Sequence, residues 1–307
     1  MSVFADLPSF GFGSAAIGRP HVDAAAARAC VEEAWQLGVR YFDTAPMYGA
    51  GRAEQRLGQV LGQLPRDEYV LSSKVGKLVR PDHDGWDYNF SRDGVLRSFE
   101  HSLQRLGVDR LDIVYLHDPD DHWVEAIGQA WPVLADLREQ GAVRAVGVGM
   151  TQAPMLARFV QEASVDGVLM AGGYSLLDTS ALTTLLPQCA ARGVAVVIAQ
   201  ALAGGLIDGV PEPMLHYRPV DAATRARVER IAAICHRNGV PTAAAAIQFP
   251  LAHPAVRTVL VGPESTAQLR EDHDWSLQAV PDAVWADLRA AGLLDAAAPT
   301  PRSGVTA

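Results

Sequence analysis

Short runs of apolar residues recur along the chain, and stretches with helical periodicity separate several of them. Polar residues rarely alternate within these runs, which is typical of parallel strands buried on both faces. We assign eight strands, at 10–14, 40–44, 69–73, 112–117, 144–149, 167–171, 194–200 and 258–262. The clearest helical stretches cover 24–38, 92–107, 123–141 and 223–239, and each ends at a glycine, as many helices do.

Alternation of strand and helix on this scale favours an α/β fold. Eight such units within about 250 residues predict a (β/α)8 TIM barrel, with one domain over 1–294 and a disordered tail over 295–307. An open, doubly wound sheet is the alternative. Its usual phosphate-binding glycine motif is missing, because GFGSAAIG does not have the spacing GxGxxG.

Composition narrows the possible partners. The chain has 307 residues and a formal net charge of −9, without a cluster of basic residues, so we expect no nucleic-acid partner. The longest uncharged apolar stretch, 193–207, is too short to span a bilayer, so we expect no membrane partner. The N-terminus lacks the pattern of a signal peptide, and the three cysteines are far apart. We expect a cytoplasmic protein with reduced thiols.

Four polar residues follow predicted strands, where a barrel of this type places its active site. Asp43 ends the second strand, Tyr48 lies in the loop after it, Lys74 follows the third and His117 closes the fourth. Each has an ordinary structural explanation, such as a turn aspartate, a surface lysine or a core histidine. Four such coincidences at one end of a barrel are much less probable than any single one.

Together these residue types can perform acid–base chemistry on a carbonyl or an alcohol. A nearby ammonium favours the phenolate of a tyrosine, and a carboxylate can hold that ammonium in place. A histidine can orient a substrate oxygen and pass on a proton. The hydride must be carried by a cofactor.

The motifs YFDTAPMYG, SSKVG and YLHD, in this order around a barrel, resemble the aldo-keto reductase superfamily. The resemblance runs from about 9 to 294 and identifies Asp43, Tyr48, Lys74 and His117 with its catalytic tetrad. Residues 88–121 and the motif VRAVGVGM are similar to the branch with L-fucose, D-threo-aldose and D-arabinose dehydrogenases and pyridoxal 4-dehydrogenases. This resemblance implies an enzyme that acts on a small-molecule substrate, an aldose. The enzyme would oxidise the anomeric hydroxyl to a lactone with NAD(P), and Tyr48 would be the general base.

The same resemblance implies a cofactor site. The family's Ser-Asn pair for the nicotinamide amide is replaced by Gly149-Met150, and a frequent glutamine by Ala171. Binding would then depend on backbone groups, on Thr151 or Gln152, or on ring stacking against Tyr174. The full set of expected nicotinamide and diphosphate contacts is Ser14, Asp43, Gly149, Met150, Tyr174, Gln200, Leu202 and Gly204.

Cofactor choice is predicted from the last strand. Gly262 and Gln268 stand where relatives that prefer NADP have a lysine and an arginine, and Glu271-Asp272 replaces Glu-Asn. A 2′-phosphate needs cationic partners, whereas it would meet acidic residues here, including Glu264, with Arg270 the only nearby cation. We therefore expect NAD to be preferred, with NADP possible.

For the substrate we expect contacts from Tyr48 and His117 and from loop residues Trp86, Asp118 and Trp123. Two other functions remain alternatives. The His- and Asp-rich segments 81–87 and 117–123 could supply the ligands of a metal-dependent barrel hydrolase, but the early strands lack an HxH motif, so we expect no required metal. A non-catalytic nicotinamide-nucleotide-binding regulatory module is also compatible with the resemblance, although the complete tetrad favours an enzyme, with pyridoxal 4-dehydrogenase the second enzymatic possibility.

Overall fold

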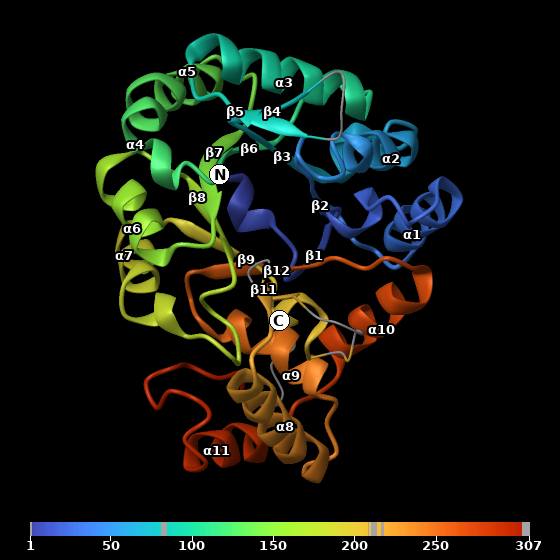
Figure 1. Ribbon diagram of the computed structural model, residues 1–307, viewed down its shortest axis with the longest axis vertical. Coiled ribbons are helices and arrows are strands. Elements are labelled where there is room, and N and C mark those ends of the chain that lie inside the picture. The colour runs from blue at the N-terminus through green and yellow to red at the C-terminus, as the bar shows by residue number, and fades with distance from the viewer. Residues whose placement is uncertain (1, 81–84, 208, 210–213, 216–217, 303–307) are drawn as a thin grey trace.

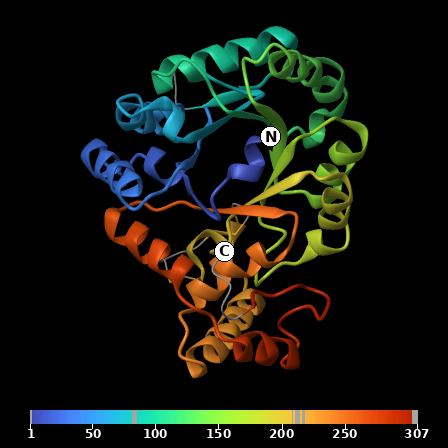
Figure 2. The same cartoon turned by 180° about the vertical axis from the view of Figure 1, so that it is seen from behind.

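A closed barrel of eight parallel strands occupies the centre of this computed structural model, which describes residues 2–80, 85–207, 209, 214–215 and 218–302 (Figures 1 and 2). The strand order β1-β12-β9-β8-β7-β6-β3-β2 makes strands that follow one another along the chain neighbours in the barrel. The predicted (β/α)8 fold is confirmed. The barrel strands are β1 (Phe10–Gly13), β2 (Tyr41–Asp43), β3 (Val70–Val75), β6 (Ile113–His117), β7 (Ala145–Met150), β8 (Gly167–Ala171), β9 (Ala195–Ala199) and β12 (Val256–Val261).

Helices surround the barrel (Figure 1). They are α1 (Ala24–Gln36), α2 (Arg52–Leu61), α3 (Arg92–Leu106), α4 (Trp123–Glu125), α5 (Trp131–Glu139), α6 (Ala153–Glu162), α7 (Leu185–Arg192), α8 (Ala222–Arg237), α9 (Thr242–Gln248), α10 (Thr266–Leu277) and α11 (Asp282–Ala290). The single helix predicted over 123–141 is divided, since a π-helical segment, Ala126–Ala130, joins α4 to α5. Pro132 explains the irregularity, because it cannot donate the backbone hydrogen bond of a regular helix.

The barrel interior is built in layers by the two-residue period of the strands. Tyr41 and Tyr115 fill the middle layer, where their hydroxyl oxygens lie 3.3 Å apart, and the Tyr41 hydroxyl is 3.1 Å from Ser72 Oγ. Glycines make room for these rings. A Cβ at Gly11 would come within 3.0 Å of the Tyr41 ring, and one at Gly147 within 2.9 Å of the Tyr115 ring.

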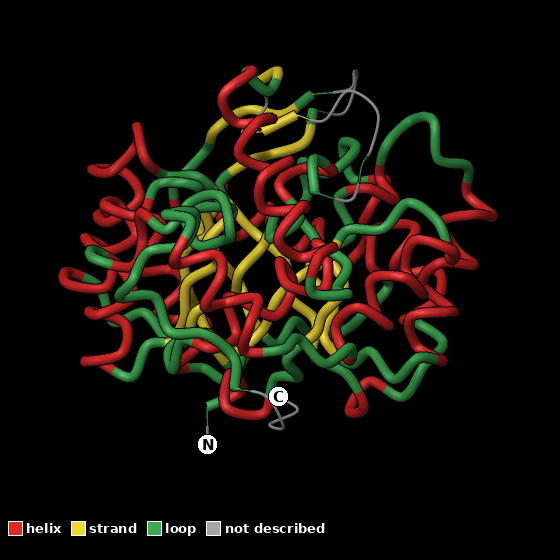
Figure 3. Tube along the Cα trace, turned by 90° about the horizontal axis from the view of Figure 1, so that it is seen from below, coloured by secondary structure: helices red, strands yellow, loops and turns green. Residues whose placement is uncertain are grey.

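A short 3₁₀ helix, η1 (Val3–Asp6), closes the end of the barrel opposite the site-bearing strand ends. Phe4 is only 2% exposed and makes an edge-on contact with Tyr115, with ring centroids 6.5 Å apart. It shares a buried cluster with inward-facing residues of the strands, including Leu169 and Leu260. The sequence pattern did not predict this plug, and helices lie on both sides of the central strands in the side view (Figure 3).

Two hairpins extend from the other end of the barrel, β4 (Lys77–Val79) with β5 (Trp86–Tyr88) and β10 (Met214–Leu215) with β11 (Arg218–Pro219). Neither was predicted, because strands of two or three residues leave no readable period. The first begins at Gly76, whose φ of 103° turns the chain sharply after β3. A side chain there would also collide with Phe90, so this close turn requires a glycine.

The prediction of a disordered tail over 295–307 is wrong for residues 295–302. Ala298 is 1% exposed, and the Arg289 guanidinium donates hydrogen bonds to the Ala298 carbonyl and to Thr300 Oγ1. Residues 303–307 lie outside the described residues. Among the helices that the structure describes, none is long and apolar enough to cross a membrane.

The plug predicts a stability effect. Phe4→Ala should leave a cavity against Tyr115 and lower the free energy of unfolding by about 3–5 kcal/mol, the usual cost of removing a buried phenyl ring. Urea denaturation measures the change. Val124→Ala, at a side chain that is mostly exposed, is the control and should have little effect. A loss below about 1 kcal/mol for Phe4→Ala would show that η1 does not support the barrel.

Candidate active site

Three strand ends bring a lysine, a carboxylate and an imidazole together above the tyrosine layer. Lys74 Nζ lies 2.6 Å from Asp43 Oδ2 and 2.9 Å from the carbonyl oxygen of Thr44. Lys74 is 1% exposed and Asp43 3%, so this is a buried ion pair with further hydrogen bonds to each partner. Such a pair is costly to bury, and removing either member would leave an uncompensated charge.

Tyr48 lies in the loop after β2 and completes the group. The centroid of its ring is 4.8 Å from Lys74 Nζ, and its ring meets that of His117 edge-on with centroids 5.9 Å apart. The loop is held close to the β1–α1 connection, because Gly49 has a φ of 60° and packs directly against the Gly18 carbonyl. The structure thus brings together all four residues that the sequence predicted as a tetrad.

The charges around this group act in opposite directions on two side chains. Burial, the largest single influence, would lower the pKa of Lys74, but Asp43 and Tyr48 together outweigh burial, so the pKa of Lys74 is raised. His117 is 6% exposed. Burial, followed by the charges of Lys77 and Lys74, holds the pKa of His117 well below its ordinary value. The site therefore combines a stable ammonium with a neutral imidazole near neutral pH.

Ser72 supports the ion pair from below and was missed at the sequence level. Its hydroxyl donates a hydrogen bond of 2.6 Å to Asp43 Oδ1, the oxygen that Lys74 does not use. The signal was weak, because Ser72 is one of two adjacent serines in β3 and only the register shows which one faces inward. Its neighbour Ser73 points outward and binds the buried carboxylate of Glu54 on α2.

The residues around the tetrad fit a nicotinamide nucleotide. Ser14 Oγ is buried at the end of β1 and has no hydrogen-bond partner among the described residues. A Cβ built on Gly149 would make ordinary van der Waals contact with Leu169 and with Lys74 Cε, 3.8 Å away, so the glycine keeps any side chain from covering the lysine on this side. Met150 is buried in the outer core, and only its backbone is available to a ligand.

The loop after β9 has the backbone shape of an anion-binding segment. Gln200, Ala203 and Gly204 have φ values of 60°, 52° and 63°, and Leu202 lies between them. Non-glycine residues with positive φ are strained, and such residues concentrate at functional sites. Successive turns of this kind direct amide groups into a concave surface that suits phosphate.

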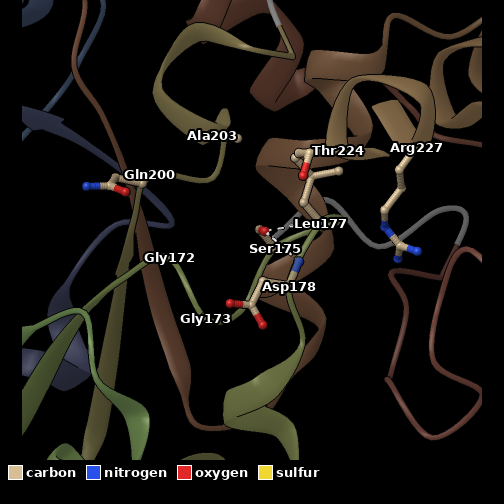
Figure 4. A pocket seen from close by; sticks show the side chains of 9 residues that line it. All are labelled: Gly172, Gly173, Ser175, Leu177, Asp178, Gln200, Ala203, Thr224 and Arg227. Carbon is tan, nitrogen blue, oxygen red and sulfur yellow. Dashed lines mark hydrogen bonds between the residues drawn. The ribbon is translucent and has the colours of Figure 1, made fainter. Parts of the chain in front are cut away.

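Gln200 also borders a cavity of about 250 Å³ between the loops after β8 and β9 and helix α8 (Figure 4). Its side-chain amide points away from Thr224 and Arg227 on the other side of this cavity. No tetrad residue lines the cavity, so it lies beside the chemistry and not at it.

Tyr174 does not reach the site, and the prediction that its ring stacks on nicotinamide is wrong. Its side chain is fully buried, with its ring centroid 5.1 Å from that of Phe249 and 5.8 Å from that of His253. A ring with no exposed surface, packed against the segment after α9, has no face left for a ligand. The sequence alone could not show on which side of the loop after β8 this tyrosine lies.

Gly262 directly follows β12, and Gln268 lies in the first turn of α10. Gly262 is exposed, and the Gln268 side chain accepts a hydrogen bond from the Glu264 amide. Glu264 itself binds two side chains from the β1–α1 connection, the guanidinium of Arg19 and the imidazole of His21. The expectation that Arg270 is the only nearby cation is therefore wrong.

Arg270 and Asp272 point elsewhere. Arg270 forms a two-pronged ion pair with Glu33 on α1, with distances of 2.6 and 2.9 Å. Asp272 is 1% exposed and lies near Cys30, where burial, Asp272 and Glu33 raise the pKa of the thiol to about 12. Asp272 is thus enclosed between α10 and α1 and cannot contact a cofactor directly, contrary to the sequence-based expectation, whereas Glu271 is exposed.

Two of the loop residues expected to contact substrate, Trp86 and Asp118, both contact Lys77, and Asp118 also lies beside His117. Lys77 binds the Asp118 carboxylate and lies 4.5 Å from the centroid of the Trp86 ring. Trp123 has other neighbours. Its ring packs on Phe159, and the guanidinium of Arg158 covers it at 3.7 Å. Both partners belong to α6, so we do not assign Trp123 to the substrate.

Comparison with known proteins agrees with this geometry. The family model of the aldo/keto reductase family matches residues 9–292. The chain is 38% identical to a D-threo-aldose 1-dehydrogenase of a Pseudomonas species, with 96% of each chain covered. It is 36% identical to a pyridoxal 4-dehydrogenase of Microbacterium luteolum, with 94% of this chain and 95% of the relative covered.

Among solved structures, the chain is similar to the holo form of an aldo-keto reductase from Bacillus halodurans. The TM-score is 0.76 at 25% identity, and 91% of each chain is covered. The barrel, the four residues at its strand ends and the family match agree with one another. The chain belongs to the aldo/keto reductase family of NAD(P)-dependent oxidoreductases.

Proposed function

We propose that this enzyme oxidises the anomeric hydroxyl of an aldose, of the L-fucose, D-arabinose or L-galactose type, to a lactone. The observation that carries the proposal is the buried Lys74–Asp43 pair beside Tyr48 and His117, in a chain 38% identical to an enzyme named D-threo-aldose 1-dehydrogenase. A relative named L-galactose dehydrogenase, from Arabidopsis thaliana, is 32% identical over 87% of this chain.

The proposed reaction uses Lys74 as an ammonium and His117 as a neutral imidazole. Tyr48 takes the proton of the anomeric hydroxyl, and Lys74 stabilises the phenolate that performs this step. His117, neutral and close to Tyr48, orients the substrate oxygen. The nicotinamide, when bound, supplies the hydride acceptor. The anomeric C–H and O–H bonds break, the C=O bond of the lactone forms, and one proton is left on the protein for release to water.

A second candidate is oxidation of the cyclic hemiacetal of pyridoxal to 4-pyridoxolactone. It is supported by 36% identity over nearly the whole chain to an enzyme named pyridoxal 4-dehydrogenase. The chemistry at the anomeric carbon is the same. Initial rates with L-fucose, D-arabinose, L-galactose and pyridoxal distinguish the two.

The first test concerns the role of Tyr48 as the general base. Tyr48→Phe should lower kcat by about 10²–10⁴-fold, the usual contribution of a general acid–base group, while nucleotide binding measured by fluorescence titration stays close to wild type. Tyr69→Phe is the matched control, because the Tyr69 hydroxyl donates to the Leu61 carbonyl in the outer core. Tyr69→Phe should lower the free energy of unfolding but leave kcat unchanged. Wild-type kcat in Tyr48→Phe, with hydride transfer rate-limiting, would refute the assignment.

The product is the second test. With a pyranose or with pyridoxal and NAD, the enzyme should form a lactone, detectable by NMR before it hydrolyses. Lactone hydrolysis draws the reaction forward, so cofactor reduction should proceed to near completion. Formation of alcohols from aldehydes, with no lactone from any hemiacetal, would contradict the proposed reaction. Nucleotide binding without turnover of any of these substrates would favour the regulatory module.

We propose further that NAD is preferred. Arg19 is held by Glu264, so a 2′-phosphate near α10 would have to displace this carboxylate, and neither Gly262 nor Gln268 offers a charge. Glu264→Gln should release Arg19 and lower the ratio of kcat/KM for NAD to that for NADP by about tenfold. Asp274→Asn, an exposed position on the same helix, is the control. A wild-type preference for NADP, or no change in Glu264→Gln, would exclude this explanation.

A further inference from the structure

A second buried lysine lies beside the tetrad. Lys77, the first residue of β4, is 3% exposed although it is charged and belongs to a short hairpin. Its Nζ donates to the Asp118 carboxylate, lies 3.4 Å from Met47 Sδ, and is 4.5 and 5.4 Å from the ring centroids of Trp86 and Tyr88. An ion pair and two aromatic faces hold the ammonium in one position.

Asp118 connects this lysine to the imidazole. Asp118 has a φ of 45°, uncommon for an aspartate, and its amide donates to the Gly149 carbonyl. This bend brings Asp118 Oδ2 to 3.7 Å from His117 Nε2, while the same oxygen accepts from Lys77. Asp118 Oδ1 makes no hydrogen bond to the described residues, and the side chain is 30% exposed.

His117 itself is suited to the neutral form. Its Nδ1 is buried and has no hydrogen-bond partner among the described residues. A protonated ring would therefore bury an unsatisfied N–H group, which is costly. A lone carboxylate beside Nε2 would nevertheless favour protonation. Among the described residues, the charged and titratable groups that contact His117 or act on its charge are Lys74 on β3, Lys77 on β4, Asp118 after β6 and Tyr48 after β2, and Asp43 on β2 is paired with Lys74.

We infer that Lys77 is a positioning residue that cancels the charge of Asp118 and thereby keeps His117 neutral, while leaving Asp118 Oδ1 free to accept a substrate hydroxyl. The inference rests on the proposed role of His117 in binding the substrate oxygen. Lys77 does not touch the reacting atoms. Its position follows from the turn at Gly76, which folds β4 back over the mouth of the barrel.

The test is an NMR titration of histidine ring signals in the free protein, with His117 assigned by mutation. In Lys77→Met the pKa of His117 should rise by about one unit, because a repelling cation is lost and Asp118 is left uncompensated. Lys77→Arg keeps the positive charge and should change the pKa of His117 little. In Asp118→Asn the pKa of His117 should fall further, because Lys77 then acts alone.

The two variants should shift the pKa of His117 in opposite directions, and this distinguishes the proposed role of Lys77 from a purely structural one. Loosening of the hairpin would expose His117 to water and raise its pKa in both Lys77→Met and Asp118→Asn. His253, buried against Tyr174, serves as an internal control in the same spectra, and thermal unfolding checks that each variant is folded. No rise in folded Lys77→Met, or a rise in both variants, would overturn the inference.

Turnover gives a second and separate readout. In Lys77→Met the acid limb of the pH profile of kcat/KM should move to higher pH, and Lys77→Arg should restore it. The titration requires no substrate, so it stands if no hemiacetal is oxidised and only the proposed function fails. Lactone formation with an unshifted His117 would instead refute the role of Lys77 alone.

Discussion

The buried pair of Lys74 and Asp43 is the interaction on which the rest of the site depends. Two opposite charges at 2.6 Å are shielded from water, and neither could remain buried without the other. The surrounding structure serves this pair. Ser72 and the Thr44 carbonyl each form a further hydrogen bond with it, and Gly149 places no side chain against Lys74.

The barrel is what makes such a site possible. Parallel strands bring their carboxyl ends to one rim, so residues as far apart in the chain as Asp43 and His117 lie on either side of Lys74 on β3. The opposite end is closed by η1 and by a cluster of apolar side chains. The polar groups of the site and the apolar cluster that contains Phe4 thus lie at opposite ends of the barrel.

The sequence was sufficient for the fold and the tetrad, because both depend on short-range features. Uninterrupted apolar runs mark the strands, and a polar residue that ends such a run must lie at the rim. Lys77, Arg19 and His21 could not be found this way, since their partners lie across unpredicted turns or more than 240 residues away. Tyr174 and Trp123 were misplaced because the sequence does not show which side of a loop faces the barrel.

The row of hydroxyl groups beneath the ion pair has a fixed polarity. Ser72 spends its only hydrogen on Asp43, so Tyr41 must donate to Ser72, and Tyr115 must then donate to Tyr41. Three O–H dipoles are thereby aligned with their positive ends toward the carboxylate. Asp43 is consequently stabilised from two sides, by an ammonium above and by an oriented column of dipoles reaching toward the floor of the barrel.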